Sequence, residues 1–500
     1  MTDITNAPSV SLDTPSSSTT RWWHRLRQAW AQFPVKVGFI GTCAIAIGSL
    51  SPAYLPQASP FWDVLRPVHL DGEVGKVGGT LLAVAGIFLL ADAWFRLRHT
   101  RYRSISHLWI LAIWALPLLF SPPVFSHDAY SYGAQGWMIH NGQSPYEGGP
   151  GILPGPFADM VSWVWRYTPA PYGPLSLQIQ HGLVDLSGFQ PWLAAWLMRI
   201  PALVGAVLAV VLIPKIAKRL GFEPDKAIWF ACLNPLLLID FIGGEHNDSL
   251  MMGLVILALW VATKPKWWPV AALVVGVAAG IKQPALLAAW VLPLLTIPLA
   301  SWKSGWQTVY AVARSVLAVG LAVGSFCLVT FATGLGFGWI NAMKVPGLVS
   351  SMAPAWIIGA RIQAIIDPGN SQYIVATNQV FMILGFVAVG VFVVVWGPRQ
   401  PLRALAWSYI AFALSASALH SWYFLWGFLL LPLGKNRRQV PWLFALVVLF
   451  LLSYAAFNFA GRNGLWGQVA AYVTAPVWLG HIALYHKVWK PATPISPASE

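Results

Sequence analysis

Long apolar runs recur along this chain of 500 residues, and short polar segments separate them. A helix that crosses a bilayer needs roughly 20 mostly apolar residues. The runs predict helices near residues 35–54, 77–95, 108–124, 195–214, 226–242, 249–263, 267–281, 284–300, 308–330, 377–396, 403–418, 422–434, 440–458 and 466–486. We therefore expect an all-α integral membrane protein, a multi-pass helical bundle with about 13–15 transmembrane helices.

Basic residues gather in the short segments between these runs, for example in Arg96–Arg103, Lys215–Lys226 and Lys435–Arg438. This is the positive-inside pattern, and it places the amino terminus in the cytoplasm. It also explains the net charge of +14 without a nucleic-acid partner. The partners that it favours are membrane lipids with anionic headgroups.

Composition supports a membrane protein, because 57% of the residues are hydrophobic and 10% are charged, whereas about a quarter are charged in a soluble domain. Cys43, Cys232 and Cys327 lie inside apolar runs, which is typical of small core residues rather than disulfides or metal ligands. The sequence contains no phosphate-binding G-x-x-x-x-G-K-[ST] loop, H-E-x-x-H motif or G-x-S-x-G motif. This argues against an ATP-driven transporter.

The domain organisation follows from these patterns. We expect a disordered cytoplasmic tail over residues 1–20, a single transmembrane domain over 21–487 and a second tail over 488–500. Within the domain, residues 126–190 form a long outer loop with one Arg, no Lys and four acids. A loop of this length in a compact protein is usually functional, and we expect it to form a lid over the bundle.

Two segments of this loop have helical character. Met160–Tyr167 has the apolar and Trp content of a helix in the membrane interface. Pro171–Gly188 is weakly apolar and either dips into the membrane or crosses it. If it crosses, the side of the membrane on which residues 245–248 lie is reversed.

Asp128 is the first candidate for chemistry. It lies in "SHDAYSYGAQG", just after an apolar run, at the boundary between membrane and water. A carboxylate there is suited to act as a general base. The alternative is that Asp128 or Ser126 caps the following helix.

A second polar cluster, "GGEHNDSLM", lies between two apolar runs and contains Glu245, His246, Asn247 and Asp248. As a simple helical hairpin, it needs only Asn247 or Asp248 as a cap. Glu245 and His246 are not explained by that role, so we expect the cluster to bind sugar hydroxyls or to assist the base.

Lys282 lies between two apolar runs, where an unpaired ammonium is costly. It either extends to the interface or pairs with a phosphate. Pro284 favours the phosphate, because it breaks the helix and leaves backbone N–H groups beside the ammonium.

Other outlying cationic groups are Arg199, Arg361 and His420. An arginine there can bind a phosphate bidentately, but an ion pair between Arg199 and Asp240 is equally compatible with the pattern. Arg166 and Lys344 are further candidates for which surface roles fit as well.

Taken in order, these motifs resemble the GT-C superfamily of membrane glycosyltransferases. The resemblance covers residues 108–434 and rests on "SHDAYSYGAQG", "YTPAPYGPL", "MRIPAL", "NPLLLIDFIGGEHNDSLM", "GIKQPALL" and "HSWYFLW". The sequence is most similar to actinobacterial α-1,6-mannosyltransferases, which use polyprenyl-phosphate mannose to build lipomannan and lipoarabinomannan.

The resemblance implies an inverting mannosyltransferase at the plasma membrane, with its active site on the outer, periplasmic side and a mannan or lipomannan acceptor. It implies Asp128 as the catalytic base, and Lys282, Arg199, Arg361 and His420 as ligands of the donor phosphate. The expected sugar- and acceptor-binding residues are His127, Tyr130, Tyr132, Trp137, Trp165, Tyr172, Glu245, His246, Asn247, Asp248, Trp422 and Tyr423.

Many relatives have a second acid two residues after the first, and metal-dependent members use both. Here the stretch reads Asp128-Ala129-Tyr130, so we expect catalysis without a metal or other cofactor. Two alternatives remain at this point. The chain is a secondary transporter or flippase of a lipid-linked sugar, or it is a GT-C transferase for another sugar.

Overall fold

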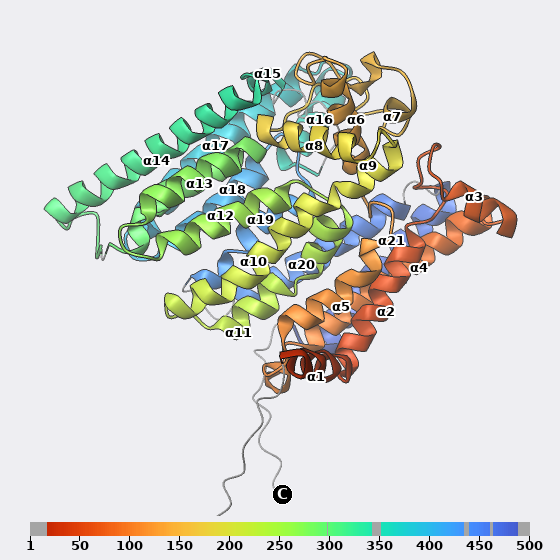
Figure 1. The fold of residues 1–500 in the computed structure, drawn as a ribbon, viewed down its shortest axis with the longest axis horizontal. Helices are drawn as coiled ribbons and strands as arrows, with labels where there is room; N and C mark the ends of the chain where they lie inside the picture. Colours follow the sequence, from red (N-terminus) through yellow and green to blue (C-terminus); the bar gives the residue numbers. More distant parts are fainter. Residues whose placement is uncertain (1–17, 298, 343–351, 435–439, 461–463, 489–500) are drawn as a thin grey trace, which may run out of the picture.

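The computed structural model describes residues 18–297, 299–342, 352–434, 440–460 and 464–488. Every regular element in these residues is a helix, which confirms the predicted all-α class. The long helices are α2 (Phe33–Gly48), α4 (Glu73–Arg96), α5 (His107–Leu119), α10 (Arg199–Arg219), α12 (Asp248–Ala262), α13 (Trp268–Ile281), α14 (Trp306–Thr333), α16 (Pro354–Ile366), α17 (Gln372–Trp396), α18 (Pro401–Ser415), α20 (Val440–Ala460) and α21 (Gly464–Tyr485). Most of them run side by side in one bundle (Figure 1).

Three apolar segments are broken into short pieces. They are α11 (Pro224–Ala227) with η4 (Ile228–Cys232) and η5 (Leu237–Gly243), η6 (Gln283–Val291) with η7 (Pro293–Leu295), and η9 (Ser421–Tyr423) with α19 (Phe424–Phe428) and η10 (Leu431–Leu433). Proline explains the first break, because Pro235 has no N–H and disfavours a helical conformation at Asn234. The Asn234 side chain replaces the lost pairing. It donates to the Phe230 carbonyl and accepts from the Leu236 N–H.

Four described helical segments are long and apolar enough to cross a membrane, namely 73–96, 191–219, 306–333 and 372–396. The number becomes six if each of two bent pairs forms one span, and seven shorter apolar helices accompany them in the described residues. A multi-pass helical membrane protein is consistent with these lengths. The number of 13–15 crossings stays a prediction.

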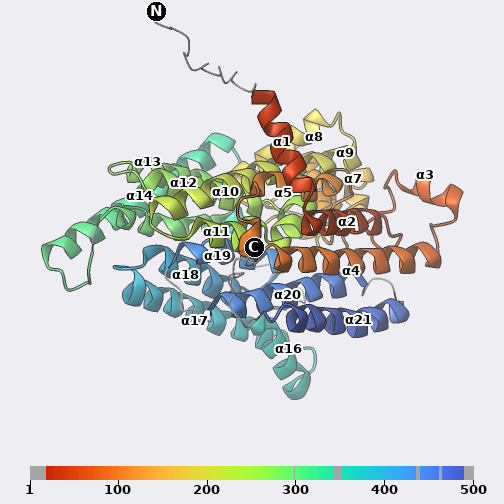
Figure 2. The ribbon, with the colours of Figure 1, turned by 90° about the horizontal axis from the view of Figure 1, so that it is seen from below.

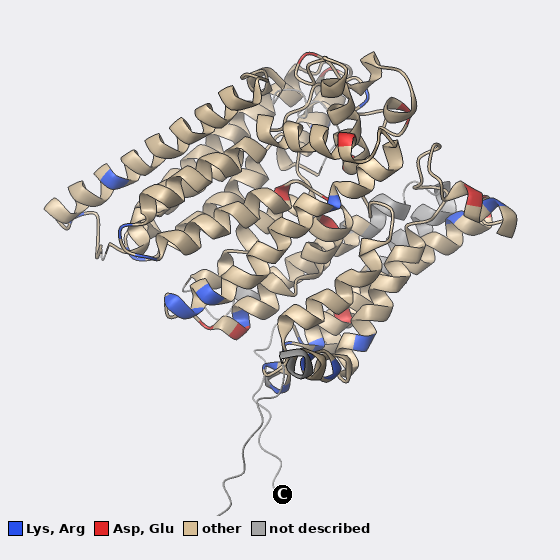
Figure 3. Cartoon of the chain, in the orientation of Figure 1, with Lys and Arg blue, Asp and Glu red and all other residues tan. Residues whose placement is uncertain are grey.

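The bundle has a lid at one end. It consists of α6 (Asp128–His140), η3 (Pro150–Ile152), α7 (Pro156–Asp159), α8 (Pro174–Leu186) and α9 (Pro191–Leu197), and it is drawn at the top of Figure 1. Most Lys and Arg residues lie toward the opposite end (Figure 3). The separation of a nearly Lys/Arg-free lid from the basic end agrees with the charge pattern of the sequence.

One expectation about local structure was wrong, because Met160–Tyr167 forms turns rather than a helix. Of the two alternatives for Pro171–Gly188, crossing is contradicted, because the segment contains α8, which packs against α6 in the lid instead of crossing the bundle. Residues 18–20, expected to belong to a disordered tail, instead form the start of α1 (Ser18–Trp30). Residues 1–17, Lys344 and residues 489–500 lie outside the described part of the chain.

A close helix crossing fixes the position of the polar turn before α12. A Cβ atom on Gly205 of α10 would overlap the carbonyl oxygen of Ser249 in α12, and one on Gly253 would lie 2.5 Å from Cα of Gly205. Small residues at such crossings let two backbones approach closely in a membrane. The crossing therefore brings the first turn of α12 against α10.

We predict that Gly205→Ala lowers the stability of the protein by about 1–3 kcal/mol, because an added methyl group must push the two backbones apart. Gly320→Ala on α14 is the matched control, since no atom lies within 4 Å of its added Cβ. Thermal unfolding midpoints in the same detergent compare the two variants. Equal midpoints would contradict the tight α10–α12 crossing.

Candidate active site

The turn between η5 and α12 carries four buried polar side chains. Glu245, His246 and Asp248 are each 1% exposed and Asn247 is 7% exposed. Neither Asn247 nor Asp248 caps α12, because Asn247 is the N-cap residue and makes no side-chain cap hydrogen bond, and the Asp248 carboxylate points to other partners. The hairpin-cap interpretation is therefore wrong, and each side chain of the turn contacts a different element.

Glu245 pairs with Arg199, the first residue of α10, with 2.5 Å between carboxylate oxygen and guanidinium nitrogen. The same guanidinium donates to the carbonyl oxygens of Leu119, Ser121 and Ile242. Arg199 is 2% exposed. Its partner is thus Glu245 rather than Asp240, and its donors are already engaged, which argues against a role in binding the donor phosphate.

Asp248 pairs with Lys282 at the end of α13. Both carboxylate oxygens lie 2.9 Å from the ammonium nitrogen, and the indole N–H of Trp426 donates to one of them at 2.8 Å. The ammonium also lies 4.5 Å from the ring centre of Tyr423 and 5.9 Å from that of Tyr172. Lys282 does not extend to the interface, and its charge is balanced inside the protein before any phosphate binds.

His246 contacts Asp128, the first residue of α6, with 3.4 Å between Nδ1 and Oδ2. At that length the contact is chiefly electrostatic, and neither ring nitrogen has an aligned hydrogen-bond partner in the described residues. The Asp128 side chain is 18% exposed, and its backbone N–H donates to Ser126 Oγ. Ser126 therefore takes the cap-like role, which leaves the Asp128 carboxylate free for another.

The pKa of the Asp128 carboxyl is lowered overall. Burial is the largest single effect and raises it, but the combined effects of His246, His420 and Lys282 outweigh burial. The structure therefore holds Asp128 as a carboxylate at neutral pH, the state that a general base requires.

Aromatic rings connect the turn to the segment after α18. The His246 ring stacks on Trp422 at 3.6 Å between centres, and Trp422 stacks on His420 at 4.3 Å. Tyr423 in turn stacks on Trp426 at 4.5 Å. The predicted residues Trp422, Tyr423 and His420 thus lie together with His246.

Burial lowers the pKa of His420 to about 4. The ring is therefore neutral at neutral pH and offers a phosphate a hydrogen bond but no charge. Arg361 is exposed on α16, which Figure 2 shows apart from the lid helices α7, α8 and α9. Arg166 pairs with Asp159 in the lid.

The lid tyrosines lie close to the turn. Tyr130 and Tyr132 are buried, and Tyr132 meets Tyr172 edge to face at 5.2 Å. His127 is anchored elsewhere, because its Nε2 lies 2.7 Å from the Tyr54 carbonyl oxygen. These contacts hold the start of α6 against both the lid and the loop after α2.

Trp137 and Trp165 do not belong to this cluster. Trp137 stacks on Phe157, and both tryptophans pack in a separate lid core. Nine residues separate Trp137 from Asp128, so the two lie on opposite faces of α6 at about 100° per residue. The structure thus contradicts the expectation that these rings stack on a sugar near Asp128.

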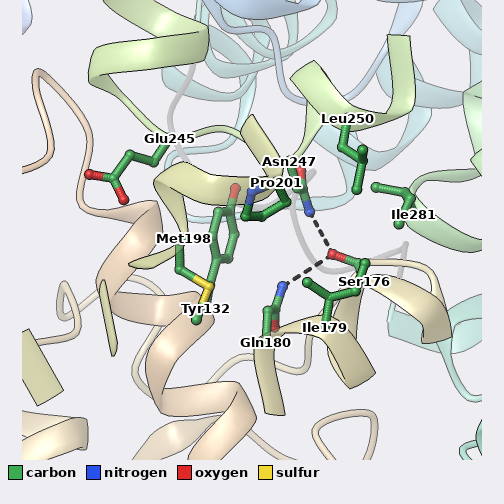
Figure 4. Close-up of a pocket in the computed structure, with 10 residues that line it drawn as sticks. All are labelled: Tyr132, Ser176, Ile179, Gln180, Met198, Pro201, Glu245, Asn247, Leu250 and Ile281. Atoms are coloured by element: carbon green, nitrogen blue, oxygen red, sulfur yellow. Dashed lines mark hydrogen bonds between the residues drawn. The ribbon is translucent and has the colours of Figure 1, made fainter. Parts of the chain in front are cut away.

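A small cavity lies between the lid and α12 (Figure 4). Asn247 and Gln180 both donate to Ser176 Oγ at its wall, at 3.2 Å each. The side-chain oxygens of Asn247 and Gln180 have no hydrogen-bond partner in the described residues. Buried polar atoms without partners indicate that water or a ligand hydroxyl completes the site.

Ser176, Gln180 and Trp426 were not among the predicted site residues. The sequence does contain a signal for Ser176 and Gln180, because they are four residues apart and therefore share one face of helix α8. Trp426 lies in an aromatic stretch that is also typical of the membrane interface, and its hydrogen bond to Asp248 is what identifies it as part of the site.

Sequence comparisons show which known proteins this chain resembles. The sequence model of a family described as "Alpha-(1->6)-mannopyranosyltransferase, N-terminal domain" matches residues 35–298. The chain is 31% identical to a protein of Mycolicibacterium smegmatis named as a probable alpha-(1->6)-mannopyranosyltransferase, over 80% of this chain and 78% of that protein. It is 28% identical to alpha-(1->6)-mannopyranosyltransferase A of Mycobacterium tuberculosis, over 88% of each chain. It is 30% identical to alpha-(1->6)-mannopyranosyltransferase A of Corynebacterium glutamicum, over 71% of this chain and 76% of that protein.

We predict that Lys282→Met destabilises the protein by about 3–5 kcal/mol, because it leaves the Asp248 carboxylate buried without its cation. The double variant Lys282→Met with Asp248→Asn should recover most of this loss, since Asn keeps an acceptor for Trp426 but carries no charge. Unfolding midpoints of the two variants in detergent test the pair. A double variant as unstable as the single one would contradict it.

Proposed function

Because the chain belongs to the α-(1→6)-mannopyranosyltransferase family, we propose that it transfers mannose from polyprenyl-phosphate mannose to a mannan or lipomannan acceptor, with Asp128 as general base. As a member of this family, the chain is a membrane glycosyltransferase that forms α-1,6-mannosyl linkages. The donor, the base, the inversion and a site on the outer face of the plasma membrane belong to the proposal.

One observation carries the choice of base. Of the carboxylates at the turn and the start of α6, Glu245 is paired with Arg199 and Asp248 with Lys282, and both side chains are at most 1% exposed. Asp128 is 18% exposed and contacts a histidine instead. A base must reach the hydroxyl proton that it removes, and Asp128 is the carboxylate of this group that a substrate can reach.

The proposed reaction is a single displacement. The acceptor hydroxyl oxygen attacks the anomeric carbon of a β-mannosyl phosphate, and Asp128 takes the hydroxyl proton. The bond from the anomeric carbon to the phosphate oxygen breaks, and the phosphate leaves with the electron pair, so the β-linked donor gives an α-linked product. A phosphate leaves readily without a proton, whereas glycosidases, which expel an alcohol, use two carboxyl groups.

The surroundings of Asp128 support chemistry without a metal. Glu245 and Asp248, the nearby carboxylates that would have to join Asp128 around a divalent cation, are already committed to Arg199 and Lys282. For the leaving phosphate we propose Lys282 as the cation and the neutral His420 ring as a hydrogen-bond donor, because both interact with Asp128. Arg199 and Arg361 are not part of this proposal.

A transporter or flippase is disfavoured by membership in an enzyme family. A transferase for another sugar remains the second candidate, and it differs only in the donor. Competition between polyprenyl-phosphate mannose and other polyprenyl-phosphate sugars in one transfer assay separates the two.

We predict that Asp128→Asn lowers the rate of mannosyl transfer by about 10²–10⁴-fold, the usual contribution of a general base. The measurement is transfer of labelled mannose from polyprenyl-phosphate mannose to acceptor by purified protein. The matched control is Asp63→Asn, because Asp63 is an exposed carboxylate in helix α3 (Trp62–Leu65). Near-normal transfer by a folded Asp128→Asn protein would overturn the assignment.

We predict that His246→Phe moves the acidic limb of the pH–rate profile to higher pH. The wild-type base loses activity only as pH falls through its lowered pKa. Without His246 the effect of burial is offset less, so the pKa of Asp128 rises. Phe keeps an aromatic ring for the stack on Trp422. His24→Phe, an exposed histidine of α1, is the control, and an unmoved limb in His246→Phe would refute the tuning role.

A further inference from the structure

The end of α6 farthest from Asp128 carries a second group of titratable side chains. His140 in the last turn of α6 meets His181 and Asp185 of α8 on the surface of the lid. One nitrogen of each imidazole and a carboxylate oxygen all lie within 4.8 Å of one another. Nothing in the proposed reaction uses these residues.

The distances suit a metal ion. Nδ1 of His140 lies 3.0 Å from Oδ1 of Asp185, and Nε2 of His181 lies 3.6 Å from Oδ2 of the same carboxylate. Tetrahedral ligands about 2.1 Å from an ion are separated from each other by roughly 3.4 Å. The two observed distances, each to a different oxygen of Asp185, bracket that value, and one donor atom from each of the three residues lies within 4.8 Å of the other two.

Neighbouring groups orient both rings. Nδ1 of His181 lies 3.3 Å from Gln178 Oε1, which can only accept a hydrogen bond, so the proton is on Nδ1 and the lone pair is on Nε2, facing Asp185. Support of this kind from the outer nitrogen is usual for metal-binding histidines. The His140 ring stacks on Trp137 and contacts Phe189, which follows Gly188 in a left-handed turn.

We propose that His140, His181 and Asp185 bind a divalent cation of the Zn²⁺ class. Two imidazoles and one carboxylate are the ligand set that favours such borderline ions over Mg²⁺ or Ca²⁺. Three protein ligands leave a fourth position for water. The bound ion ties the end of α6 to α8 and thereby holds the lid together.

This site is independent of the proposed catalytic chemistry. Twelve residues of α6 separate His140 from Asp128, which is about 18 Å along the helix axis. An ion there does not touch the reacting atoms, so its binding is compatible with metal-free transfer. The alternative is that His140 and Asp185 form only an exposed hydrogen-bonded pair.

The experiment measures binding of Co²⁺ and Zn²⁺ to the full-length protein in detergent, after removal of any polyhistidine tag and of metal by chelator. We expect one equivalent of Co²⁺ to give the visible absorption bands of a low-coordinate site, and Zn²⁺ to displace it. Titration calorimetry with Zn²⁺ gives the affinity. No stoichiometric binding would overturn the inference.

Two variants locate the site. Asp185→Asn should weaken Zn²⁺ binding at least about 10-fold, because even the loss of a residue that only hydrogen-bonds to a metal ligand lowers the affinity by that much. The Asn side chain still accepts a hydrogen bond from His140. His140→Ala with His181→Ala should abolish the Co²⁺ bands. His24→Ala is the control for unspecific histidine binding. Unchanged bands in both variants, at normal gel-filtration behaviour, would place the metal elsewhere and refute the proposal.

Discussion

Two carboxylates buried on one short turn, Glu245 and Asp248, constrain the rest of the structure. A buried carboxylate needs a cation and hydrogen bonds, because desolvation otherwise costs several kcal/mol. The cations come from two different helices, Arg199 from the start of α10 and Lys282 from the end of α13. The turn is therefore held from two sides, and His246, between its two acids, is directed at Asp128 in the lid. The same pairs remove Glu245 and Asp248 from the list of available bases.

The positions of the helices were predicted well from the sequence, because an apolar run of bilayer length is compatible with few structures other than a helix. It also predicted that Asp128, His246, Trp422 and Tyr423 belong to one site. It did not predict the partners, since Arg199 and Glu245 are 46 positions apart and several carboxylates were equally plausible by pattern. Trp137 was misplaced for an avoidable reason, because its spacing from Asp128 already puts it on the opposite face of α6.

The turns at Met160–Tyr167 show where composition misleads. Valine and tryptophan suit a membrane interface, but they are weak helix formers, and a short isolated helix is marginal without packing. Here the segment is tied to its neighbours instead. The Gly151 N–H donates to the Arg166 carbonyl oxygen, and the Arg166 side chain pairs with Asp159. Such tertiary contacts of the backbone leave no trace in hydrophobic periodicity.

In the proposed reaction, the lid solves a problem that is specific to a base beside a lipid-borne substrate. Partial burial is needed so that water does not compete with the acceptor, yet burial alone would protonate the carboxyl group and disable it. A Lys or Arg in direct contact would keep it ionised but would also weaken it as a proton acceptor. Histidine is the intermediate choice, because its contact with Asp128 at 3.4 Å offsets burial without a tight ion pair. The two strong cations near the turn, Arg199 and Lys282, pair with Glu245 and Asp248. Asp128 therefore has His246 as its nearest cationic partner.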